Sequence, residues 1–172
     1  ENEPKIIITN LMGYLRFLPT KEIYDNSIIE INKNDSYDIK ELVNKLYSIG
    51  YSRETIVNKT GEMAIRGFVI DVFPLGYENP VRIEFWGDEI DSIKEFNIDS
   101  QLTLKELNNV KIYPCTEFIV ENTQCFQNDK QRDLIKYYFP GNLLSFLGNN
   151  SILIVDEENN LTGGISKFID EK

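Results

Sequence analysis

The fold is decided by residues 63–73, which read Met63-Ala64-Ile65-Arg66-Gly67-Phe68-Val69-Ile70-Asp71-Val72-Phe73. Aliphatic, β-branched and aromatic side chains dominate this run, and such residues favour extended strands. Pro74 follows directly and ends the strand, because proline lacks the N–H group that a sheet ladder requires. The run therefore predicts one long β-strand that carries Arg66 in its interior.

The residues after this strand predict an antiparallel meander. Residues 75–80 combine glycine, asparagine and proline, a composition typical of turns. Residues 81–86 alternate apolar with polar side chains, as half-buried strands do, and residues 87–88 supply a Gly-Asp turn. The return strand is expected over 89–96, with a bulge or bend at Ile93, where the alternation breaks.

A helix precedes the meander. Asp38 can cap its first turn, and Glu41, three residues later, completes a pattern that resembles a capping box. Gly50 supplies the stop signal. Between these ends, apolar side chains recur at the spacing of one helix face, and they are Ile39, Leu42, Val43, Leu46 and Tyr47. We expect this face to pack into the core.

These patterns together predict an α+β domain over residues 28–112, in which an antiparallel β-meander packs against a helix. Residues 1–27 and 113–172 have a different character. Apolar runs at 5–9 and 151–155 are typical of buried strands in a parallel sheet. Short helices are expected over 10–18, 129–139 and 143–147. The flanks therefore predict pieces of an α/β domain.

The composition excludes several kinds of site. The 172 residues include no histidine, which removes Ser-His-Asp and Cys-His catalysis and histidine-liganded zinc. Cys115 and Cys125 form neither a zinc site nor a disulfide framework, and we expect free thiols in a reducing cytosol. No run approaches the roughly 18 apolar residues of a membrane span. We expect a cytoplasmic chain with no catalytic residue, metal or cofactor of its own.

The net charge of −10 makes the chain a poor DNA binder by itself, because DNA binding depends on lysines and arginines that neutralise phosphates. Two groups of carboxylates are candidate sites, and the first leaves an unrelated hydrolase open as another class of function. Asp88, Glu89 and Asp91 gather at a predicted turn, which we interpret as turn chemistry because a tight turn is convex and solvated. Asp156 and Glu157 follow an apolar run, as the Mg²⁺-binding carboxylates of helicase-type ATPases do. No Gly-x-x-x-x-Gly-Lys-Ser/Thr segment accompanies them, so no nucleotide site is predicted.

Arg53 and Arg66 have two interpretations. A strand arginine is most often the ion-pair partner of a neighbouring carboxylate, which for Arg66 would be Glu84 or Asp71. In the functional interpretation, both guanidinium groups project from one face and donate hydrogen bonds to the carboxylates of a partner protein. Three aromatic residues either add apolar contact nearby or belong to the core, and they are Phe68, Phe85 and Trp86.

Three runs of the sequence, 50–53, 61–74 and 80–93, resemble a known family. They are similar to the ordered motifs Gly-Glu-Phe-Ala-x-Arg-Gly, Asp-x-Phe-Pro, Pro-x-Arg-x-Glu-Phe and Asp-Glu-Ile-Asp-Ser-Ile. These motifs characterise the UvrB-homology module near the N-terminus of the bacterial transcription-repair coupling factors, known as Mfd. UvrB shares much of the pattern, but Ala64 and the run Ser100-Gln101-Leu102-Thr103-Leu104 favour the coupling factors.

The resemblance implies a protein-interaction module that recruits the damage-recognition protein UvrA in transcription-coupled nucleotide excision repair. Arg53 and Arg66 match the family's UvrA-contacting arginines by position, and Phe68 is expected to add apolar contact. Met63 replaces the family's usual phenylalanine. Leu102 stands where the family has an arginine, which puts any role of that arginine in doubt.

The resemblance also implies a larger context. Residues 1–27 and 113–172 look like parts of a degenerate helicase-like domain that has lost its ATP site, since Glu158 and Asn159 replace the Ser and His of the UvrB box. Full-length family members are expected to be ATP-dependent translocases, with ATP, Mg²⁺, RNA polymerase and DNA bound by other domains. The alternative is a fragment of UvrB, an ATP-dependent damage-loading protein that would bind UvrA as well.

Overall fold

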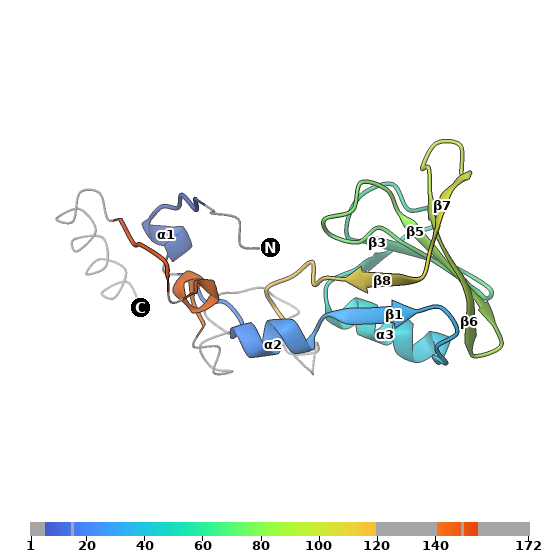
Figure 1. Cartoon of the computed structure of the whole chain (residues 1–172), viewed down its shortest axis with the longest axis horizontal. Helices are drawn as coiled ribbons and strands as arrows, with labels where there is room; N and C mark the ends of the chain where they lie inside the picture. Colours follow the sequence, from blue (N-terminus) through green and yellow to red (C-terminus); the bar gives the residue numbers. More distant parts are fainter. Residues whose placement is uncertain (1–5, 15, 120–140, 149, 155–172) are drawn as a thin grey trace. The chain divides into compact units, whose positions relative to one another are not determined.

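The computed structural model describes residues 6–14, 16–119, 141–148 and 150–154 (Figure 1). The chain divides into two compact units, one formed by residues 22–127 and the other by residues 1–21 together with 128–172. The predicted helix over 129–139 and the carboxylates at 156–157 lie outside the described residues.

The larger unit is built on a six-stranded sheet with the strand order β2-β3-β4-β5-β6-β7 (Figure 1). Its first two strands pair in parallel, and every following pair is antiparallel. The strands are β2 (Ser52–Arg53), β3 (Glu62–Arg66), β4 (Val69–Val72), β5 (Val81–Trp86), β6 (Glu89–Phe96) and β7 (Thr103–Leu107). The predicted meander corresponds to β3 through β6, and β7 was not predicted.

One face of this sheet is covered by a helix and a second, two-stranded sheet. The helix α3 (Ile39–Ser48) is capped by Asp38, whose carboxylate accepts hydrogen bonds from the amides of Lys40 and Glu41 at 2.7 and 2.9 Å. The small sheet pairs β1 (Ile29–Asn32) with β8 (Asn109–Ile112) in antiparallel fashion. Its inward residues share one core with the helix and the large sheet. That core includes Ile31, Leu42, Leu46, Met63, Ile70, Val72, Ile83, Ile93, Val110 and Ile112.

Residues 63–73 form two strands, not the single strand predicted from their composition. Arg66 pairs with Val69, so the two residues between them make a tight hairpin turn. Gly67 takes a φ of +60°, which glycine adopts without steric cost and which suits the first position of a type II′ turn. Arg66 therefore lies at the end of β3, and Phe68 lies at the turn.

A β-bulge shifts the register between β5 and β6. Glu84 pairs with Ser92 and Phe85 with Ile90, so Asp91 is the extra residue of β6. The bulge lets Ile90 and Ile93, three positions apart, both face the core. A bulge was predicted in this strand, and it lies two residues before the expected position.

The described residues of the smaller unit include the short helix α1 (Leu11–Tyr14) and the 3₁₀-helix η2 (Leu143–Phe146). Leu18 and Gly141 form an isolated antiparallel bridge, in which the Leu18 amide donates to the Gly141 carbonyl at 2.8 Å. The strand predictions at 5–9 and 151–155 are wrong for the residues described, since 6–9 and 151–154 have no regular structure. A strand needs a hydrogen-bonded neighbour, and composition alone does not provide one.

The helix α2 (Lys21–Asn26) leads into β1. The residues described confirm the α+β class, with a predominantly antiparallel sheet and few helices. They do not include helicase-like α/β pieces, and the domain limits at 28 and 112 stay a prediction. Among the described helices, none is long and apolar enough to cross a membrane.

Candidate partner-binding surface

The side of the six-stranded sheet opposite the main core carries most of the polar side chains of β3 to β6. We call this side the outer face. The strand registers place on it the side chains of Arg66, Asp71, Arg82, Glu84, Trp86, Ser92 and Lys94. One end of the same side is covered by a small apolar cluster of Val57, Ala64 and Phe73.

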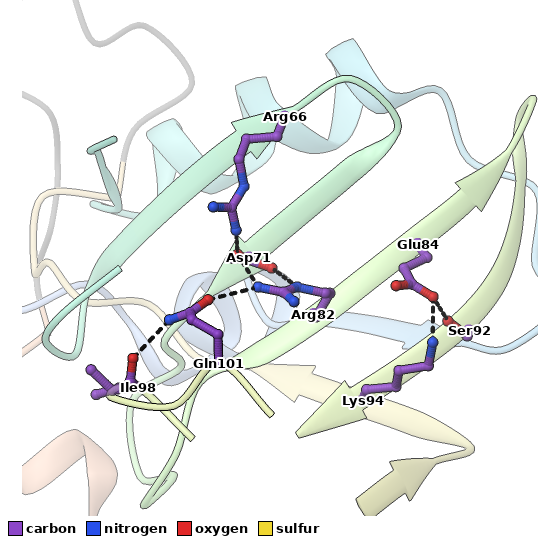
Figure 2. A network of polar contacts seen from close by, with 8 residues as sticks. All are labelled: Arg66, Asp71, Arg82, Glu84, Ser92, Lys94, Ile98 and Gln101. Atoms are coloured by element: carbon purple, nitrogen blue, oxygen red, sulfur yellow. Dashed lines mark hydrogen bonds and ion pairs between the residues drawn. The ribbon is translucent and has the colours of Figure 1, made fainter. Parts of the chain in front are cut away.

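Asp71 is the centre of the outer face. Its side chain is only 2% exposed, yet two arginines reach it from neighbouring strands (Figure 2). Arg82 donates from Nε to Oδ1 at 2.7 Å and from Nη2 to Oδ2 at 2.9 Å, a two-point ion pair. Arg66 donates from Nη2 to Oδ2. Asp71, not Glu84, is therefore the carboxylate that Arg66 contacts.

Arg82 is fixed by two further contacts. Its Nη2 donates to Gln101 Oε1 at 3.0 Å, and its guanidinium lies 4.4 Å from the centre of the Phe96 ring. Gln101 has a φ of 59°, unusual for a residue other than glycine, and its side-chain Nε2 donates to the Ile98 carbonyl at 2.7 Å. The loop between β6 and β7 thus holds Arg82 in place.

A second polar group on the outer face surrounds Glu84. Lys94 and Ser92, both on β6, donate to the same Glu84 oxygen (Figure 2). The hydrogen bond from Lys94, followed by that from Ser92, lowers the pKa of the Glu84 carboxyl below its ordinary value despite partial burial. The charges of Lys94 and Glu84 balance, so this group carries no net charge.

The side chains linked around Asp71 and Glu84 carry one cation in excess, although the strand register also places Glu89 and Glu106 on the outer face. Three cations, Arg66, Arg82 and Lys94, face two carboxylates, Asp71 and Glu84. The most accessible of the three cations is Arg66, whose side chain is 47% exposed. In a chain with a net charge of −10, this local excess favours a partner that presents a carboxylate.

Two exposed aromatic residues lie at the hairpin ends of the sheet. The Phe85 amide donates to the Phe68 carbonyl at 2.9 Å, which extends the β4–β5 ladder into the turn. Phe68 is 62% exposed and Trp86 is 82% exposed, whereas Phe85 is 7% exposed and belongs to the core. For Trp86 the sequence left both an apolar contact with a partner and a place in the core open, and only Phe68 was expected to contact UvrA. The alternation of β5, with Phe85 inward, could have identified Trp86 as exposed.

Arg53 occupies a different place from the one expected. Its side chain is exposed and has no hydrogen-bonded or ion-paired partner among the described residues. The parallel register pairs Arg53 with Met63, a core residue, while Arg66 alternates onto the outer face. The register thus places the two arginines on opposite sides of β3, about 10 Å apart along the strand. The expectation that both project from one face is not met.

The remaining sequence candidates do not assemble into a site. Asp88 and Glu89 lie at the β5–β6 turn, and Asp91 is the exposed bulge residue. Over the described residues, no group of three His, Cys, Asp or Glu side chains could hold a metal ion. Cys115 is a free thiol, and Cys125 lies outside the described part of the chain. Leu102, which stands where the resemblance expects an arginine, is 68% exposed.

Most of the larger unit matches a known protein family. Residues 29–118, just over half of the chain, match the family model described as UvrB interaction domain. The matched segment runs from β1 past β8, so it includes every residue of the outer face.

Several curated relatives are transcription-repair-coupling factors. The protein of Bacillus subtilis (strain 168) is 30% identical over 90% of this chain and 17% of its own length. That of Staphylococcus aureus (strain bovine RF122 / ET3-1) is 34% identical over 67% of the chain and 10% of its own length. The chain thus spans less than a fifth of these two relatives. With its family match and these similarities, the chain belongs to the UvrB interaction domain family, in the form found in transcription-repair-coupling factors.

Proposed function

We propose that this chain is the module through which a transcription-repair-coupling factor recruits UvrA. The observation that carries the proposal is Arg66, a half-exposed cation on a strongly acidic chain whose hairpin ends also expose Phe68 and Trp86. Exposed aromatic and arginine side chains dominate the energetics of protein interfaces. The surface accordingly suits a protein partner that offers a carboxylate next to apolar groups.

In the proposed complex, Arg66 donates charge-assisted hydrogen bonds to a UvrA carboxylate, and Phe68 supplies apolar contact. Arg53 contacts UvrA separately, from the edge strand β2. A desolvated pair of this kind contributes about 2 kcal/mol or more, so its loss weakens binding about thirtyfold or more. The fragment itself needs no catalytic residue, metal or cofactor for this task.

The other activities of the pathway belong, in this proposal, to other parts of a longer cytoplasmic protein. Those parts bind RNA polymerase and DNA and use ATP and Mg²⁺ to translocate. Residues 28–112 would form the UvrA-binding domain, flanked by residues 1–27 and 113–172 from a degenerate helicase-like domain. This division is supported by the extent of the family match, residues 29–118.

The proposal is tested by calorimetric titration of the whole chain with UvrA from the same organism. We expect saturable binding that weakens by more than about tenfold in Arg66→Ala. Lys111→Ala is the matched control, because the Lys111 side chain is also 47% exposed and ion-paired but lies on β8. No binding by the folded wild-type chain, or equal losses in both variants, would reject the proposal.

A further inference from the structure

Two arginines donate hydrogen bonds to the carboxylate oxygens of Asp71, and their contacts are unequal. Arg82 contacts both oxygens, with Nε on Oδ1 and Nη2 on Oδ2. Arg66 contacts only Oδ2, and only through Nη2 (Figure 2). Among the described residues, the rest of the Arg66 guanidinium has no partner, so it can receive a second carboxylate.

The carboxylate that holds Arg66 is itself firmly placed. Asp71 is 2% exposed in the middle of β4, and its pairing with Arg82 is backed by Gln101 and the Phe96 ring. A chain of contacts therefore runs from the Gln101 loop through Arg82 and Asp71 to Arg66. Holding a long side chain in its binding rotamer reduces the entropy lost when a partner arrives.

We infer that Asp71 is a positioning residue, which fixes Arg66 in the orientation that receives a carboxylate of the partner protein. This inference rests on the proposed function, since it assigns Asp71 a role at the same surface. Because Arg82 already balances the charge of Asp71, the trio of side chains keeps one positive charge. Arg66 is thus oriented without being neutralised.

The opposite role for Asp71 would be that of a competitor. A carboxylate bound to Arg66 can compete with the partner's carboxylate, and its removal would then strengthen binding. The two roles predict opposite signs for the same substitution. Asp71→Asn, which keeps the shape of the side chain and removes its charge, therefore separates them.

The test is a calorimetric titration of UvrA with wild-type chain, Asp71→Asn, Arg66→Ala and the double variant. We expect about fivefold weaker binding for Asp71→Asn, and no further loss when it is added to Arg66→Ala, since coupled residues are not additive. Ser92→Ala is the control, because it removes a hydrogen bond to Glu84 on the same face; it should stay within about twofold of wild type. Unchanged or tighter binding by Asp71→Asn, or a full fivefold loss on top of Arg66→Ala, overturns the inference.

A measurement on the free chain separates this inference from the recruitment proposal. The Arg66 Nε–H signal in ¹⁵N NMR, assigned by its absence from Arg66→Ala, should show a restricted side chain in wild type and a mobile one in Asp71→Asn. Equal mobility in both variants rejects the positioning role of Asp71, whether or not UvrA binds.

If Asp71→Asn does not fold, Gln101→Ala replaces it, because this variant keeps every charge. It should make the Arg66 side chain more mobile and weaken UvrA binding about twofold. In the Arg66→Ala background it should not weaken binding further. Unchanged Arg66 mobility in Gln101→Ala also overturns the inference.

Discussion

Arg82 and Asp71 form a two-point ion pair across β5 and β4, with 2.7 Å between Nε and Oδ1 and 2.9 Å between Nη2 and Oδ2. The Asp71 side chain is 2% exposed and the Arg82 side chain 22% exposed, so this pair is more buried than the ion pairs that Arg66 and Lys94 form on the outer face. Arg66 donates to the same Asp71 carboxylate, so the pair that packs within the sheet also orients Arg66.

Arg82→Gln should destabilise the fold. The substitution leaves a buried carboxylate with Arg66 as its single ion-pair partner among the described residues. We expect a loss of about 1–3 kcal/mol in the free energy of unfolding, below the roughly 3–5 kcal/mol of fully buried pairs because Arg82 is partly solvated. Urea unfolding followed by circular dichroism measures it. Lys105→Gln, which breaks an ion pair with a lysine 61% exposed, should cost less than about 1 kcal/mol; equal effects of the two would contradict this account.

Glu62 should make stability depend on pH. Its carboxylate accepts the amides of Asn58 and Lys59 at 2.8 and 3.1 Å, and the Asn58 hydrogen bond is the main cause that lowers its pKa below 4.5. A lowered pKa means that this stabilisation is complete above about pH 4.5 and is lost as the pH falls through the folded pKa. Glu62→Gln should therefore cost about 1–2 kcal/mol at pH 7, with a gap that narrows on acidification.

The measurement for Glu62 is the urea midpoint of wild type and variant at pH 7 and near pH 3. Glu30→Gln is the control, because Glu30 forms an ion pair but its side chain is 54% exposed. A gap between Glu62→Gln and wild type that is the same at both pH values would show that the charge of Glu62 is not responsible.

Phe85 and Trp86 are sequence neighbours with opposite roles. Phe85→Ala should cost about 3–5 kcal/mol of stability, because the ring is buried in the core. Trp86→Ala should change stability by less than about 0.5 kcal/mol, since the ring is 82% exposed. The same Trp86 variant should weaken UvrA binding at least about fivefold. Thermal melts and a titration measure both effects, and a Trp86 variant that binds normally would remove this residue from the interface.

Gly50 and Gly67 should respond differently to alanine. Both have positive φ, +95° and +60°, which costs an L-residue about 1–2 kcal/mol. A Cβ at Gly50 would also lie 2.8 Å from the Thr116 Cβ, whereas a Cβ at Gly67 meets no atom within 4 Å. Gly50→Ala should therefore lower the melting temperature more than Gly67→Ala does. The reverse order would mean that Thr116 can move aside at little cost.

The elements that the sequence predicted well are those specified by local chemistry. Asp38 caps α3 as expected, because the capping pattern involves neighbouring residues alone. The alternation over 81–86 identified β5 correctly, and the broken alternation near Ile93 indicated a real bulge. These signals depend on residues a few positions apart, so one sequence is sufficient to interpret them.

What the sequence did not predict depends on partners distant along the chain. The apolar runs near 6–9 and 151–154 are not strands, since no paired neighbour is described for them. Arg66 could have paired with Glu84 or Asp71, and only the register of β3, β4 and β5 decides for Asp71. The same register separates Arg53 from Arg66. The resemblance identified the arginines by position and not by orientation.

We propose that UvrA docks on the outer face at the β3–β4 hairpin. Amide hydrogen exchange of the chain, measured with and without UvrA, shows where the partner binds. We predict slower exchange at residues 66–69 and 86–88 in the complex, with no change in β1 and β8. Protection confined to β1, β8 or α3, or exchange that UvrA leaves unchanged everywhere, would contradict the claim.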